Sequence, residues 1–136
     1  MILDTNVVSE FMHASPDPRV VAWMDLQPHT FITSITVAEL VHGVTRMPEG
    51  ERKSHIADAI DVVVETDFVG RVLPFDETAG FEYAHIVVSR KRRGLPMGTM
   101  DAMIAAIALS VGSSLATRNT KDFEHLGIPL INPWDQ

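Results

Sequence analysis

The first twelve residues, MILDTNVVSEFM (residues 1–12), contain the pattern that decides the fold. Residues 1–3 predict a very short apolar strand that ends at Asp4, and residues 7–12 have the pattern of a helical turn. A further helix is expected after Pro18. A strand that leads directly into helices is typical of parallel sheets, because parallel strands need crossover connections between them.

The same alternation continues through the rest of the chain. Further strands are predicted at residues 31–35, 72–75, 115–117 and 129–131, and further helices at residues 36–46, 48–67, 77–93, 99–111 and 120–125. Pro48, Gly94 and Gly112 mark helix ends. The sequence therefore predicts an α/β fold, with helices on both faces of a parallel sheet, in a single domain over residues 1–136.

The composition excludes several classes of site. The chain has no cysteine, which excludes disulfides, thiolate nucleophiles and zinc–thiolate or iron–sulfur centres. Its six histidines show no helical zinc-binding spacing. The longest apolar run, residues 102–109, is far shorter than the roughly twenty residues of a membrane span, and no secretory signal begins the chain. We therefore expect a cytoplasmic protein without a membrane segment.

Carboxylates follow three of the predicted strands. Asp4 follows the first strand, Glu39 follows the second, Asp122 follows the fourth, and Asp101 opens a helix. Ligands of parallel α/β folds bind beyond the carboxyl ends of the strands. Several like charges in one pocket need a compensating cation, and oxygen donors suit Mg²⁺ or Mn²⁺. Such a site suits the chemistry of phosphate esters.

Each acid also has an ordinary structural explanation. Asp4 can cap the helical turn that follows it, and Asp101 lies in the first turn of a helix, where the helix dipole favours a carboxylate. Capping pairs account for the other two acids: Thr36 with Glu39, and Asn119 with Asp122. The functional explanation gains weight from the four acids together, and most from Asp4, because a charge directly after so short a strand is unusual.

Four segments, in their order and spacing, resemble the PIN-domain ribonucleases. They are ILDTN (residues 2–6), ITVAEL (35–40), MDAMIAA (100–106) and ATRNTKDF (116–123). Within that superfamily the chain is similar to the VapC toxins of type II toxin–antitoxin pairs. Two further segments, RVLPFD (71–76) and NPW (132–134), resemble the FitB-type branch. The resemblance spans essentially the whole chain.

This resemblance implies a three-layer α/β/α sandwich around a central, mostly parallel sheet, and a toxin that hydrolyses RNA. It implies Asp4 and Asp101 as the main ligands of Mg²⁺ or Mn²⁺, completed by Glu39. Asp122 is assigned as the fourth catalytic acid, with Asn119 as the other residue considered for that position. Supporting roles are expected for four polar residues: Thr5, Asn6, Thr117 and Asn119.

The resemblance also implies partners. Family members are homodimers neutralised by a small antitoxin, here of the VapB or FitA type. The predicted helices between residues 48 and 93 contain more apolar residues than one buried stripe needs, namely Val62, Val63, Val64, Phe81 and Val87. This excess supports a homodimer. The alternative is that all five are buried in the core.

RNA must bind a chain whose net charge is −7, so local basic patches are needed. Arg118 and Lys121 flank the predicted acidic site. A second candidate RNA contact is the cluster Arg90, Lys91, Arg92 and Arg93. The alternative for this cluster is a solvated helix end that complements the helix dipole.

Two functions other than a nuclease also have to be considered. A haloacid-dehalogenase-like phosphatase also has an Asp after its first strand, but it needs a second Asp two residues later, where this chain has Asn6. A non-catalytic PIN-type module that binds RNA or protein would have no need of the acids, and all of them are present here.

Overall fold

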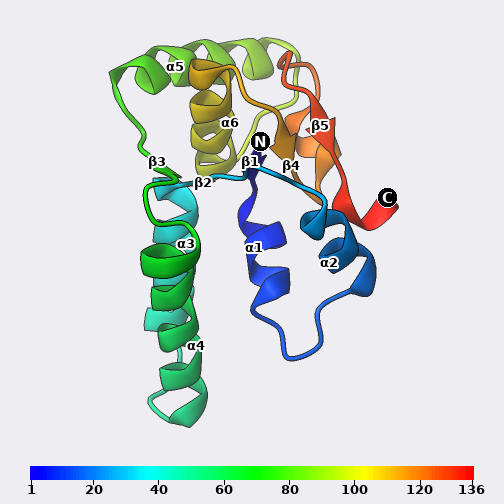
Figure 1. Ribbon diagram of the computed structural model, residues 1–136. Coiled ribbons are helices and arrows are strands. Elements are labelled where there is room, and N and C mark those ends of the chain that lie inside the picture. The colour runs from blue at the N-terminus through cyan, green and yellow to red at the C-terminus, as the bar shows by residue number, and fades with distance from the viewer.

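Five short parallel strands form the centre of the computed structural model, which describes residues 1–136 (Figure 1). The strands are β1 (Ile2–Leu3), β2 (Ile32–Thr33), β3 (Val72–Leu73), β4 (Leu115–Ala116) and β5 (Leu130–Ile131). One group pairs in the order β1-β4-β5, and β2 pairs with β3. A parallel bridge between Ile2 and Phe31 joins the two groups. All pairings are parallel, so the predicted sheet is confirmed.

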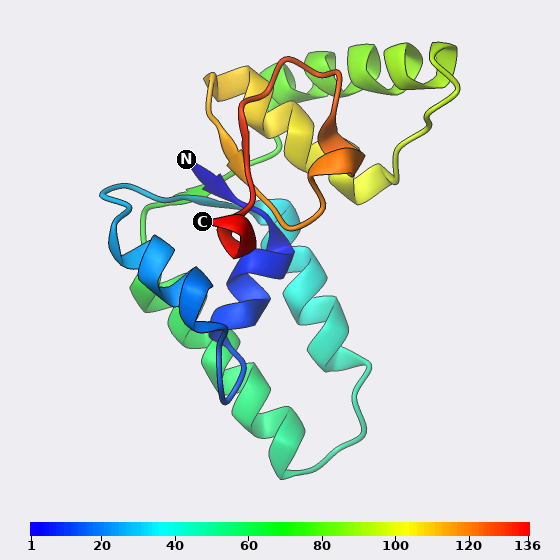
Figure 2. The same cartoon turned by 90° about the vertical axis from the view of Figure 1, so that its right-hand side faces the viewer.

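Helices cover both faces of this sheet, as the two views in Figure 1 and Figure 2 show. The α-helices are α1 (Thr5–Phe11), α2 (Pro18–Asp25), α3 (Ser34–Thr45), α4 (Glu51–Val62), α5 (Glu77–Arg92) and α6 (Thr99–Val111). Three shorter helical segments are η1 (Val63–Asp67), η2 (Thr120–Phe123) and η3 (Pro133–Asp135). The pair α5 and α6 packs on one face, and α1 to α4 lie on the other. The predicted three-layer α/β/α architecture is confirmed.

Successive strand residues enter two separate hydrophobic cores. Ile2 and Leu115 pack in the core beneath α5 and α6, whereas Leu3 and Ala116 pack in the core beneath α1 to α4. The side chains of a strand alternate between the two faces of its sheet. Because both faces are covered, the strands show no alternation of apolar and polar residues, and Thr33, the one polar strand residue, is fully buried.

The second strand ends earlier than the apolar pattern predicts. Thr33 is the N-cap of α3, because its side chain accepts a hydrogen bond from the backbone N–H of Thr36 at 3.2 Å. The chain turns into the helix at Ser34 as a result, and residues 34–35 are helical. Gly112 ends α6 in the left-handed conformation (φ 66°), as its position in the sequence predicts.

The apolar residues that suggested a homodimer divide between the core and the surface. Val63 is buried, whereas Val62 is 51%, Phe81 74% and Val87 38% exposed. Burial of all these side chains within one chain, the alternative to a homodimer, is therefore wrong. Val88, 48% exposed, extends the exposed apolar face of α5.

None of the helices has both the length and the apolar character needed to cross a membrane.

Candidate active site

Asp4 lies where β1 runs into α1, beside the end of the neighbouring strand β4. Its carboxylate is 4% exposed and caps α1, because Oδ1 accepts the backbone N–H of Thr5 at 2.8 Å. The other oxygen, Oδ2, accepts the Thr117 hydroxyl at 2.7 Å and the Asn6 side-chain amide at 3.2 Å. Capping therefore uses one oxygen of Asp4, and the second is oriented by residues from two strand ends.

The turns that follow β1 and β4 are joined by side chains. The Thr117 hydroxyl donates to Asp4 and accepts the backbone N–H of Asn119 at 3.0 Å. Asn6 Oδ1 accepts the backbone N–H of Arg118 at 3.3 Å. These contacts exist because parallel neighbouring strands end at the same edge of the sheet.

Glu39 reaches the same edge from α3. Its Oε1 accepts the Thr5 hydroxyl at 2.8 Å, and that hydroxyl lies 2.9 Å from the hydroxyl of Thr36. The Thr5 hydroxyl has one proton, which it donates to Glu39, so Thr36 donates to Thr5. The capping-box explanation of Glu39 is wrong, since Thr33 caps α3 and the Glu39 carboxylate contacts α1.

Asp101 lies in the first turn of α6 and is partly exposed. Partial burial raises the pKa of its carboxyl to about 6, and the charges of Asp4 and Asp122 add to this effect. Burial also raises the pKa of Asp4; hydrogen bonds from Thr117 and Thr5 oppose this shift, and the charges of Glu39 and Asp122 add to it. The region therefore disfavours its own negative charges and favours a proton or a cation.

One open pocket of about 450 Å³, called here the acidic pocket, contains these groups. Its lining residues are Asp4, Thr5, Asn6, Ser9, Glu10, His13, Glu39, Asp101, Arg118, Asn119 and Trp134. Asp122 is exposed on η2 and does not line the pocket, although its charge acts on Asp4 and Asp101. Asn119, the other residue considered for the fourth position of the site, does line the pocket. Its side chain makes no capping hydrogen bond to η2.

The donor chemistry of the acidic pocket fits a hard divalent cation. Carboxylate oxygens are the ligands that Mg²⁺ and Mn²⁺ prefer, and these ions often use only one or two direct carboxylates beside water. Burial and the charges of Asp4 and Asp122 raise the pKa of Asp101, so a cation bound beside this carboxylate would stabilise its ionised form. The structure has no group of three or more His, Cys, Asp or Glu side chains arranged to hold a metal ion. The acids share one pocket without forming a closed ligand set.

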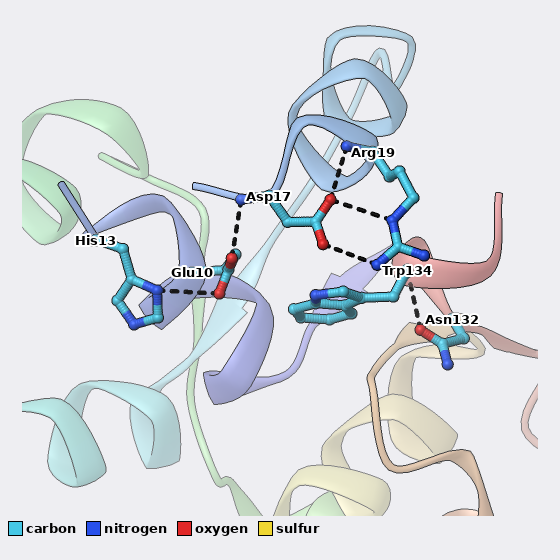
Figure 3. A network of polar contacts seen from close by, with 6 residues as sticks. All are labelled: Glu10, His13, Asp17, Arg19, Asn132 and Trp134. Atoms are coloured by element: carbon cyan, nitrogen blue, oxygen red, sulfur yellow. Dashed lines mark hydrogen bonds and ion pairs between the residues drawn. The ribbon is translucent and has the colours of Figure 1, made fainter. Parts of the chain in front are cut away.

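The outer wall of the pocket holds Ser9, Glu10 and His13, which the sequence motifs did not indicate; Figure 3 shows the last two. Glu10 accepts the backbone N–H of Asp17 at 2.9 Å, and its Oε2 lies 3.1 Å from Nδ1 of His13. Glu10 thereby ties the loop between α1 and α2 to the pocket wall. Asp17 in turn accepts the guanidinium of Arg19 at 2.9 Å, which lowers the pKa of its carboxyl.

Helical spacing could have found some of these residues. Ser9 and Glu10 follow Thr5 and Asn6 by four residues, so they lie on the same face of α1. Trp134 belongs to the NPW segment singled out by resemblance, but helical spacing does not place it at the pocket. It reaches the pocket because η3 packs against α2 at the end of the chain.

The predicted RNA contacts separate into different environments. The Arg118 guanidinium lies 4.9 Å from the centre of the Trp134 ring, at the rim of the acidic pocket. Four other basic residues are exposed or largely exposed: Lys91, Arg92, Arg93 and Lys121. Arg90 is 5% exposed, and its guanidinium donates to backbone carbonyls inside the fold. The expectation that Arg90 contacts RNA is therefore corrected.

The PIN domain family model matches residues 1–129 of the chain. The chain belongs to the PIN domain family. This PIN domain is 42% identical to VapC ribonuclease Y4jK of Sinorhizobium fredii, over 99% of the chain and 98% of the relative. It is 37% identical to toxin FitB of Neisseria gonorrhoeae, over 98% of each. Membership of this family rules out the haloacid-dehalogenase alternative.

The solved structures agree with this assignment. The crystal structure of FitAcB from Neisseria gonorrhoeae superposes on the PIN domain with a TM-score of 0.90 and 36% identity, over 99% of both chains. The resemblance seen in the sequence motifs is thus confirmed at the level of the family and of the fold.

Proposed function

We propose that this PIN domain, taken as one domain over residues 1–136, is the toxin of a type II toxin–antitoxin pair and an endoribonuclease that uses Mg²⁺ or Mn²⁺. The main support for this proposal is that Asp4, Glu39 and Asp101 line one pocket, in a chain whose relatives are named as a ribonuclease and a toxin. Three elements that are distant in sequence supply these acids.

Asp4 and Asp101 would hold the cation, with Glu39 completing the set and Asp122 adding negative charge beside it. When bound, the ion would polarise a phosphoryl oxygen of RNA and lower the pKa of water. Thr117 and Asn6 orient Oδ2 of Asp4, the oxygen that does not cap α1, and Thr5 orients Glu39, so these two acids keep their directions before substrate arrives.

Exposed basic groups supply the attraction for RNA. Arg118 lines the acidic pocket and its guanidinium is held against the Trp134 ring, which restricts its motion before binding. Lys121 and the exposed residues Lys91, Arg92 and Arg93 extend the positive charge. We assign phosphate contacts to these five residues.

The partner we propose is a small antitoxin of the VapB or FitA type. A pocket with several close carboxylates binds a guanidinium well, because one Arg can bridge two carboxylates by paired hydrogen bonds. An apolar groove beside the acidic pocket, with Leu40, Val44 and Ile56 in its lining, offers further contact area.

The direct test uses purified, antitoxin-free protein and end-labelled transfer and messenger RNAs. We expect cleavage with Mg²⁺ or Mn²⁺, none with EDTA, and none by Asp4→Asn or Asp101→Asn variants that remain folded. Asp61→Asn removes an exposed acid of α4, outside the acidic pocket, and serves as the matched control. Wild-type rates in both pocket variants, or full activity after exhaustive chelation, would show that the proposal is wrong.

A further inference from the structure

Arg90 is a buried cation that no carboxylate neutralises. It lies in the last turn of α5 with 5% of its surface exposed, and it takes part in none of the ion pairs of the structure. Its Nε donates to the carbonyl of Leu95 at 2.7 Å, and Nη1 donates to the carbonyls of Asp122 and Glu124 at 3.0 and 2.9 Å. Burial of an unpaired charge is costly, so these contacts are a specific feature of the fold.

The carbonyls that Arg90 contacts belong to the turn that carries Asp122. This turn is a single 3-10 segment, η2, with no side-chain cap, and His125, two residues after its end, has a positive φ of 67°. Phe123 anchors the segment in the hydrophobic core, 1% exposed. Arg90 binds the carbonyls on both sides of Phe123, so it determines how the turn is oriented about that anchor.

Asp122 is the acid whose place depends on this turn. Its charge raises the pKa of Asp4 and of Asp101, although its side chain is exposed and does not line the acidic pocket. Its exposed carboxylate takes part in none of the ion pairs of the structure. The distance from Asp122 to the pocket is therefore set by its backbone, which Arg90 binds.

We propose that Arg90 is a positioning residue, which holds the η2 turn so that the Asp122 carboxylate lies beside the acidic pocket. This proposal rests on the assignment of the pocket as a cation-dependent nuclease site. Arg90 itself is buried away from RNA and acts only through Asp122. A planar guanidinium with several fixed donors can bind three carbonyls in different directions, which a lysine ammonium does less well.

The experiment is a double-substitution cycle of Arg90→Met and Asp122→Asn, with two readouts. The first readout is kcat and KM for RNA cleavage, and the second is Mn²⁺ affinity measured by calorimetry without RNA. Arg46→Met is the matched control, because Arg46 is an exposed arginine at the end of α3, outside the acidic pocket and the predicted RNA contacts. Arg90→Lys keeps the charge and serves if Arg90→Met does not fold.

We expect each single substitution to lower kcat and Mn²⁺ affinity by about 10- to 100-fold, the usual effect of losing a residue that orients a metal site. KM stays unchanged, because Arg90 does not contact RNA. In the Asp122→Asn background, Arg90→Met has no further effect on either readout, because the two residues act as one unit. Arg90→Lys gives a smaller loss, and Arg46→Met gives none.

The proposal is overturned if the double variant loses kcat or Mn²⁺ affinity by the product of the two single losses. It is also overturned if folded Arg90 variants keep wild-type kcat and Mn²⁺ affinity. A rise in KM alone would instead assign Arg90 to RNA binding, which also overturns it. If the wild-type protein binds Mn²⁺ but cuts no RNA, the proposed function fails, and the Mn²⁺ arm of the cycle still decides the role of Arg90.

Discussion

At the scale of single residues, Asp4 shows that a structural and a functional role can share one side chain. Its Oδ1 caps α1, and its Oδ2 is oriented by Thr117 and Asn6 at the pocket. Asp101 differs, because it lies in the first turn of α6 without a side-chain partner and with a raised pKa. The helix dipole favours its charge, and partial burial beside other acids disfavours it more strongly.

The raised pKa of Asp101 predicts how stability depends on pH. Its carboxyl has a pKa of about 6 in the folded protein against an ordinary value of 3.8, so the folded state binds the proton more tightly. Without divalent cations, the free energy of unfolding should therefore fall as pH rises through this interval. The Asp101→Asn variant should lose part of this pH dependence. Near neutral pH its free energy of unfolding should be higher than that of the wild type by about 1 kcal/mol, after allowance for solvent screening.

Urea unfolding in EDTA, at about pH 4 and about pH 7.5, measures this difference. Asp61→Asn, the exposed control, should follow the wild-type curve. An Asp101→Asn variant that is less stable than wild type near neutral pH would contradict the electrostatic account of the pocket.

At the scale of elements, the N-terminus of α3 decides where Glu39 lies. Thr33 is fully buried and caps the helix, which begins one residue later and carries Glu39 toward α1. A helix that began at Thr36 instead would place Glu39 in its first turn, as a capping residue. The Thr33 hydrogen bond that starts α3 therefore also determines that Glu39 lines the acidic pocket.

Thr33→Val should lower the free energy of unfolding by about 1 to 2 kcal/mol, because it removes an N-cap in a buried position. Thr45→Val is the control: its hydroxyl donates to the Val41 carbonyl on the exposed surface of the same helix. Chemical denaturation compares the two variants. Glu39→Ala should leave the Thr33 cap intact and cost less stability than Thr33→Val, and a loss as large as that of Thr33→Val would contradict the assignment of the cap to Thr33.

At the scale of the whole molecule, α5 separates two surfaces of different character. One side of the helix packs against α6, and the opposite side exposes Phe81 and Val88 to solvent, with Val87 partly exposed on the flank between them. Three large apolar side chains on one helix are consistent with an interface, and a second copy of this chain is the predicted occupant.

We expect light scattering to give the mass of a dimer at micromolar concentration, and Phe81→Glu to give a folded monomer. The reason is that a charge at the centre of an apolar interface has no partner when the interface closes. Leu26→Glu is matched in exposure, 79% against 74% for Phe81, but lies at the end of α2, and it should stay dimeric. A wild-type monomer, or a Phe81→Glu dimer, would contradict this prediction.

The acidic pocket also predicts how the antitoxin inhibits. Replacement of one basic residue in the carboxy-terminal tail of the antitoxin by Ala should abolish inhibition and weaken binding less, since the remaining apolar contacts persist. Binding and inhibition are measured separately for each basic residue. If every variant still inhibits fully, the antitoxin acts at a surface remote from Asp4, Glu39 and Asp101.

Local signals in the sequence were sufficient for the order of strands and helices, the parallel sheet, and the acids at the strand ends. Apolar runs, helix-ending glycines and a charge directly after a strand involve only residues that are neighbours in the sequence, so these features can be predicted without knowledge of the fold. Parallel strands also end at one edge of a sheet, and for this reason the polar residues that follow β1 and β4, Asp4 and Thr117 among them, are neighbours.

Only the tertiary structure decided the roles that depend on distant parts of the chain. Arg90 has the same sequence environment as Arg92 and Arg93, yet it is buried, because carbonyls 32 and 34 residues away fold back onto it. Glu39 fits a capping box by spacing, but its partner is Thr5, 34 residues away. Burial and hydrogen-bond partners are properties of the folded chain, and residues of one type differ in role when the fold gives them different neighbours.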